Sequence, residues 1–126
     1  MKRYLRGVAG LLVWAGSFYL LQAQSEGEPK ALFEKVLGST LKNDYSALVT
    51  VCDEGMKEMV TPDMLADLNR SLLVRFKGGY TPVYMGYLDK QGARVHYWKI
   101  VLKDQGDDML MSLAVRQQLV SAFNLK

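Results

Sequence analysis

The hydrophobic residues follow two different spacings along the chain, and the change between them lies near Gly79. From Pro29 to about Phe76 they recur every three or four residues, which is typical of helices that bury one face. Beyond Gly79 they alternate with polar residues, as they do in strands that bury one face. The pattern therefore predicts a helical half followed by a sheet.

Turn and capping residues divide the helical half into three predicted helices. Asn43-Asp44 ends the first helix, and Thr61-Pro62-Asp63 opens the third with an N-cap and a proline at the first helical position. Gly78-Gly79 ends the third helix. The second helix lies between these signals and carries apolar residues at helical spacing, which are Tyr45, Leu48, Val49, Cys52 and Met56.

Two strands joined by a hairpin are predicted immediately after the helices. Tyr80–Leu88 and Ala93–Leu102 flank the turn signal Lys90-Gln91-Gly92. In the second strand, Lys99 and Lys103 mark one face as the wetter one. The opposite face, which we expect to cover the helices, carries His96, Trp98, Ile100 and Leu102.

The last part of the chain is open to two interpretations. A helix through Met109 to Phe123 fits the propensities of its Leu, Met, Ala and Gln residues. However, the apolar residues of Met109–Val115 would cover all sides of such a helix, whereas strands at Met109–Val115 and Leu119–Leu125 complete a meander. We favour the strands. The predicted fold class is α+β, with three N-terminal helices packed on a four-stranded antiparallel curved sheet.

The first 24 residues have the order of a secretory signal peptide. Lys2, Arg3 and Arg6 precede the apolar run Val8–Leu21, and the small residue Ala23 suits cleavage by signal peptidase. A retained membrane anchor is the alternative, but the run has 14 residues, and a bilayer core needs roughly 20. We predict a signal peptide at residues 1–24, a single α+β domain at 25–126, and export to the periplasm or the exterior.

The excess of basic over acidic residues lies in the predicted signal peptide. The full sequence has 16 Lys and Arg residues against 13 Asp and Glu residues, a net charge of +3. Without Lys2, Arg3 and Arg6, 13 basic residues remain against the same 13 acidic ones. A neutral domain has no net attraction for phosphate backbones or anionic lipids, so we expect no nucleic-acid partner and membrane contact only during export.

Several short motifs resemble a bacterial secreted domain of unknown function in the cystatin-like, nuclear-transport-factor-two-like superfamily. The resemblance covers nearly the whole predicted domain, although Asn43 stands where the family usually has Gly. It implies helices packed on a curved sheet around a cone-shaped cavity, and it brings no catalytic residue with it. The segments that carry it are Asn43-Asp44-Tyr45, Met59 to Leu65 and Phe76 to Tyr80.

The sequence offers little catalytic chemistry. His96 is the only histidine and Cys52 the only cysteine, so metal sites built from several such ligands are disfavoured. The helical spacing places Cys52 in the core, as a buried inert thiol. Motifs for a Ser or Cys nucleophile and Gly-rich phosphate loops are absent. We predict no catalytic residue, no cofactor and no metal.

Aromatic residues provide the best candidates for a binding site. Tyr84, His96 and Trp98 fall on the first predicted hairpin, where such side chains can line an apolar cavity or simply pack the sheet. We expect His96 at the open rim of that cavity. The methionines are expected to fill gaps in the core. They are Met56, Met59, Met64, Met85, Met109 and Met111.

The sequence thus favours a non-catalytic module that binds a small apolar ligand or a protein, with Tyr84, His96 and Trp98 as its ligand-binding residues. This step rests on analogy of fold. One alternative is a small acid–base enzyme of the isomerase or hydrolase type, with His96 at the centre of its pocket. The other is a structural subunit that forms a homodimer through the sheet face.

Overall fold

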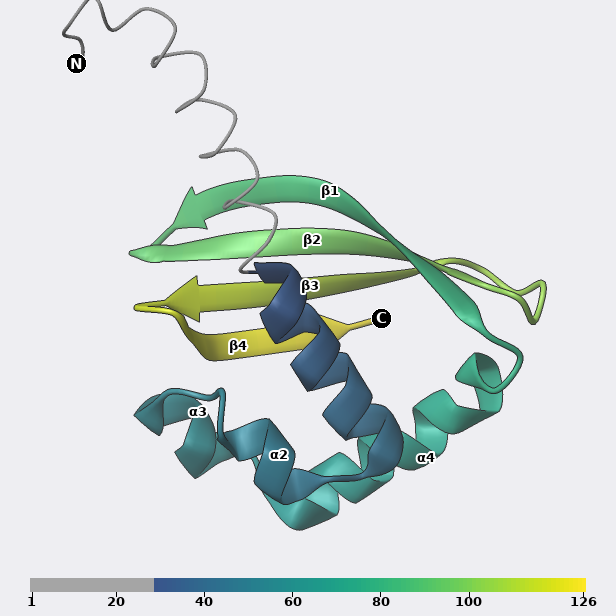
Figure 1. Cartoon of the computed structure of the whole chain (residues 1–126), viewed down its shortest axis with the longest axis horizontal. Coiled ribbons are helices and arrows are strands. Elements are labelled where there is room, and N and C mark those ends of the chain that lie inside the picture. Colours follow the sequence, from purple (N-terminus) through teal and green to yellow (C-terminus); the bar gives the residue numbers. More distant parts are fainter. Residues whose placement is uncertain (1–28) are drawn as a thin grey trace, which may run out of the picture.

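A computed structural model describes residues 29–126 of the chain (Figure 1). The predicted signal peptide, residues 1–24, lies outside the described residues. Within the described part, no helix is both long enough and apolar enough to cross a bilayer. Over residues 29–126, four helices are followed by four strands, so the α+β class is confirmed.

The helical half contains the first helix, described over residues 29–42, and then α2 (Tyr45–Val49), α3 (Glu54–Met59) and α4 (Pro62–Phe76). An N-cap side chain opens each of the last three. Asp44, Asp53 and Thr61 each accept a hydrogen bond from the backbone N–H three residues later, which satisfies a group that the first turn leaves unpaired. The predicted proline at the start of α4 is confirmed.

The expected set of three helices is wrong, because the second one is interrupted between Val49 and Glu54. There the backbone turns toward the sheet, and Cys52 forms an isolated parallel bridge with Val120. The two backbone bonds to Val120 and the Asp53 cap replace the helical bonds that the segment loses. Cys52 is nevertheless buried, as predicted, and its thiol donates to the Leu48 carbonyl.

The sheet consists of β1 (Tyr80–Lys90), β2 (Ala93–Leu102), β3 (Met109–Arg116) and β4 (Leu119–Leu125), antiparallel and in the order of the sequence. The strand interpretation of the C-terminal part is therefore confirmed. Tight turns account for it: both central residues have positive φ in Gln91-Gly92 and again in Gln117-Gln118, the geometry of two-residue hairpin turns. Register shifts in β1–β2 and β3–β4 add bulges, which bend the strands.

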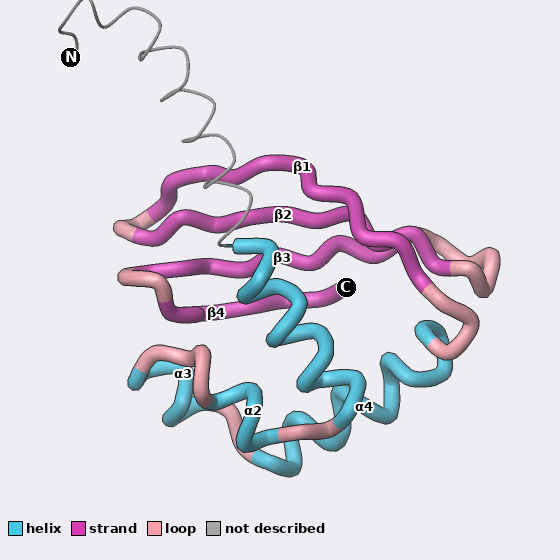
Figure 2. Tube along the Cα trace, viewed as in Figure 1, coloured by secondary structure: helices cyan, strands magenta, loops and turns pink. Residues whose placement is uncertain are grey.

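One face of the sheet is packed and the other is wetter, as predicted. Figure 2 shows the first helix crossing the sheet, with the other helices following on the β4 side. Asn69 of α4 donates to the carbonyls of Thr40 and Leu41, and so ties α4 to the end of the first helix. The core between helices and sheet includes Phe33, Val36, Leu37, Leu48, Leu65, Leu72, Phe76, Trp98, Ile100, Met111, Leu113 and Val120.

Candidate functional site

The three predicted ligand-binding residues lie together on the inner face of the β1–β2 hairpin. Tyr84 is paired with Trp98 across the strands, and His96 lies two residues before Trp98. The ring centroids are 5.3 Å apart for Tyr84 and Trp98, and 5.9 Å apart for Tyr84 and His96. The hairpin register therefore builds an aromatic cluster, which we define as Phe33, Tyr84, Tyr87, His96 and Trp98.

The side chains of the aromatic cluster pack against one another and occupy most of the space between them. Trp98 is only 3% exposed and stacks on Phe33 of the first helix, with ring centroids 4.4 Å apart. A depression of about 270 Å³ beside it is lined by Tyr84 and Trp98, together with Lys30, Phe33, Glu34 and Pro82. His96 does not line that depression. The role of these residues in ligand binding stays a prediction.

His96 is held as a buried, neutral side chain. It is 4% exposed, so the prediction that it lies at an open rim is wrong. Its Nδ1 and the Tyr84 hydroxyl share a hydrogen bond of 2.9 Å, whose direction depends on the imidazole tautomer. Burial lowers the pKa of His96, and the positive charge of Arg94 lowers it further. Both effects keep the imidazole uncharged near neutral pH.

A general acid–base pair would need a second titrating group beside His96. Among residues 29–126, no carboxylate hydrogen bonds to the imidazole, because Asp89 instead holds Arg94 at 2.8 Å. Arg94 in turn covers the Tyr87 ring, 4.1 Å from its centroid. The arrangement has the form of a packed hairpin end rather than a proton relay.

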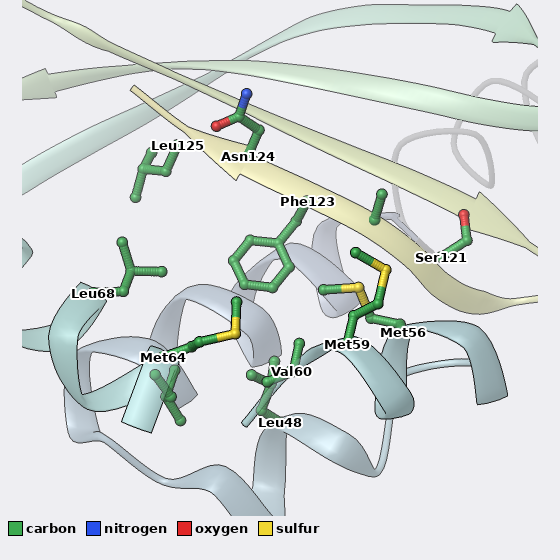
Figure 3. Close-up of a pocket in the computed structure, with 12 residues that line it drawn as sticks. Leu48, Met56, Met59, Val60, Met64, Leu68, Ser121, Phe123, Asn124 and Leu125 are labelled. Carbon is green, nitrogen blue, oxygen red and sulfur yellow. The ribbon is translucent and has the colours of Figure 1, made fainter. Parts of the chain in front are cut away.

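A second site, which the sequence did not indicate, lies between α3, α4 and β4. It is a pocket of about 400 Å³ (Figure 3). We call it the methionine pocket because Met56, Met59 and Met64 contribute to its wall. The remaining lining residues are Leu48, Val60, Leu65, Leu68, Ser121, Ala122, Phe123, Asn124 and Leu125.

Two of these methionines are open to solvent, and so is Met85 of β1, which corrects the expectation that the methionines fill the core. Met59 is 68% exposed and Met64 is 55% exposed, while Met56 is buried. Figure 3 shows Phe123 of β4 on one side of the pocket and the methionines across from it. Methionine side chains are flexible and polarizable, so they adapt to apolar ligands of different shape.

The methionine pocket has polar groups but no titratable side chain in its wall. Ser121 donates its hydroxyl to the Ala114 carbonyl, and the side chain of Asn124 points away from Phe123 in Figure 3. Such a wall suits a ligand that is mainly apolar and makes few directed hydrogen bonds.

The other reactive groups are accounted for by local structure. Burial raises the pKa of the Cys52 thiol, and the nearby Asp53 raises it further, so the thiolate is disfavoured. Asp104 accepts two hydrogen bonds from Arg75. Between residues 29 and 126, no group of three or more His, Cys, Asp or Glu side chains is placed to hold a metal ion.

The chain matches no protein-family model, no curated protein and no solved structure. Support for a function therefore has to come from the geometry of the aromatic cluster and of the methionine pocket.

Proposed function

We propose that the chain is an exported, non-catalytic binding module of the cystatin-like, nuclear-transport-factor-two-like class, and that the methionine pocket is its ligand site. Helices on one face of a four-stranded meander are compatible with that class. The methionine pocket is the observation that supports the binding role. Its volume of about 400 Å³ lies in the range of small-molecule sites, which are concave and lined mainly by apolar side chains.

The exposed methionines favour a binding role over ordinary packing. Leaving Met59 and Met64 in water forgoes the free energy that burial would bring, roughly 1.5–3 kcal/mol for each fully buried side chain. Both line the methionine pocket, whereas the third exposed methionine, Met85 of β1, is 62% exposed and is not part of the pocket wall. An apolar ligand would cover Met59 and Met64 and gain that free energy on binding.

The two alternatives from the sequence have weaker support. An enzyme centred on His96 would need access to an imidazole that is nearly fully buried and bonded to a phenol. A homodimer through the outer sheet face would use exposed residues such as Val83, Val101 and Leu110, but the exposed Lys99 pairs with both Val83 and Leu110 in the sheet register. The wall of the methionine pocket contains no charged side chain.

The binding test uses Nile red, a neutral dye whose fluorescence rises in apolar surroundings. We expect the purified protein to bind it, and Met64→Lys to weaken binding about tenfold or more, because a charge at the pocket mouth is costly to desolvate. The matched control is Val74→Lys, a change at another exposed position of α4 that is not part of the pocket wall. Equal binding by the two variants, or no binding at all, would contradict the proposal.

Export is tested by fractionating cells that carry the tagged full chain. A full-length cytoplasmic product would contradict export.

A further inference from the structure

The two edges of the sheet are protected differently. The order β1-β2-β3-β4 leaves β1 and β4 as the edge strands. β1 carries Pro82 and a bulge between Tyr84 and Gly86. Both devices obstruct the pairing of a further strand, because a proline lacks an N–H donor and a bulge twists the edge away. β4 contains no proline, and its edge is managed in another way.

The chain itself covers the first part of the β4 edge. The Val120 N–H donates to the Val51 carbonyl at 2.7 Å, and the Asp53 N–H donates to the Val120 carbonyl at 2.8 Å. The chain then leaves the sheet at the Asp53 cap and enters α3. Residues 51–53 are thus a very short added strand that stops beside Val120.

The second part of the β4 edge is left open. Leu110 and Lys126 exchange both backbone hydrogen bonds, and such pairs alternate with non-bonded pairs along an antiparallel ladder. Ser112 and Asn124 therefore form the next bonded pair, and the N–H and C=O groups of Phe123 and Leu125 are directed away from β3. Within residues 29–126, no hydrogen bond engages these outward groups.

This open edge borders the methionine pocket. Phe123 and Leu125, whose backbone groups are unpaired, also contribute side chains to the pocket wall, and Met59 and Met64 lie on the opposite side (Figure 3). Backbone donors and acceptors therefore stand next to an apolar cavity. That combination is used by sheets that bind an extended peptide as an added strand, with main-chain bonds for affinity and pockets for alternate side chains.

Charged residues around the helical side of the pocket indicate which sign of charge a partner should carry. Two of the acidic residues there are neutralised locally, Glu54 by Lys57 and Asp67 by Arg70. Glu58 and Asp63 are exposed and form no ion pair with any of residues 29–126. Each directly precedes one of the exposed methionines in the sequence. A partner with Lys or Arg beside its apolar residues would complement them.

We propose that the methionine pocket accepts an extended segment of a partner protein, which pairs with β4 at Phe123 and Leu125 as a fifth strand. Alternate apolar side chains of the segment enter the pocket, and basic residues at its ends lie near Glu58 and Asp63. This inference rests on the proposed function, since it uses the same pocket, and it names the ligand as an extended peptide with apolar and basic residues.

The test uses the full chain and a fluorescent peptide of about seven residues, a length typical of one strand, in which leucine and threonine alternate between terminal lysines. We expect binding that weakens about tenfold or more when one alternate set of peptide amides is N-methylated, because those amides face β4. Methylation of the other set should change affinity less than about twofold, since those amides face solvent. Equal effects of the two sets would overturn strand addition. Because these peptides are measured against the unaltered protein, the result does not depend on any variant folding.

A protein variant gives a second, independent readout. Leu125→Pro removes the outward N–H without removing a ladder bond to β3, a position where an edge strand tolerates proline. Its control, Leu125→Ala, shortens the side chain and keeps the N–H. We expect Leu125→Pro to bind the peptide about tenfold more weakly than Leu125→Ala.

The outcomes separate the two proposals. Nile red binding with no peptide binding would overturn the strand inference and leave a small apolar ligand as the occupant. Loss of binding for both probes would contradict the proposed function itself. Peptide binding that persists unchanged in Leu125→Pro would place the peptide elsewhere and overturn the inference.

Replacing the terminal lysines of the peptide with glutamates should weaken binding several-fold through repulsion by Glu58 and Asp63. Unchanged binding would overturn the basic character of the partner.

Discussion

The two ends of the layer between helices and sheet are built in opposite ways. At the β1–β2 end, Trp98 stacks on Phe33, and Tyr84 and His96 bond to each other, so the aromatic cluster fills its own space. At the β4 end, flexible methionines stand in solvent around a pocket. Large aromatic residues can thus mark the place where the fold is closed, while less conspicuous residues mark the place where it is open.

The largest expected effect on stability comes from removing the Trp98 side chain at the closed end. Trp98→Ala removes a fully packed indole and leaves a cavity against Phe33, so we expect the free energy of unfolding to fall by about 3–5 kcal/mol. Urea denaturation followed by circular dichroism measures it. Trp98→Phe, which keeps a ring in the site, serves as the control and should cost clearly less. A loss below about 1 kcal/mol for Trp98→Ala would mean that the aromatic cluster is not a closed core.

The sequence predicted the fold at the closed end because local signals and tertiary contacts agree there. The alternation in β2 identified its buried face, and Gln91-Gly92 adopts the turn that its composition suggested. The break after α2 could not be predicted in the same way. It depends on backbone bonds from Val51 and Asp53 to Val120, which lies far along the chain, and helical periodicity carries no information about such a partner.

The candidate site shows the same limit. Sequence reasoning placed Tyr84, His96 and Trp98 together correctly, since their spacing and the hairpin register determine it. It could not find the methionine pocket, because the exposure of Met59 and Met64 depends on how α3 and α4 are set beside β4. A methionine at helical spacing looks the same whether another element covers it or not.

A smaller effect at the closed end concerns the charge state of His96. Its pKa is lowered by burial and then by Arg94, with Asp89 opposing, so the unfolded chain binds this proton more readily than the folded one. The stability that the neutral imidazole contributes is complete above the unfolded pKa of about 6.5 and is lost as the pH falls toward the lower folded value.

We therefore expect the free energy of unfolding to drop as the pH is lowered from about 7.5 to 5.5. In His96→Gln, which cannot titrate in this range, the drop should be smaller, whatever the stability of the variant at pH ~7.5. Urea midpoints at a series of pH values measure both proteins. Parallel pH profiles would show that His96 changes its protonation as easily in the folded protein as in the unfolded chain, and the closed end would then be more accessible than its burial indicates.

The smallest expected effect on stability lies at the open end. Met59→Gln and Met64→Gln exchange thioethers for amides of similar length at positions that are mostly in solvent. We expect each to change the free energy of unfolding by no more than about 0.5 kcal/mol, although both should weaken Nile red binding because a polar group then faces the apolar wall. A loss of about 2 kcal/mol or more, the cost typical of core methionines, would mean that these side chains pack inside the folded protein. The contrast between a closed and an open end would then disappear, because both would be ordinary core, and the β4 edge would have no pocket for an incoming strand to fill.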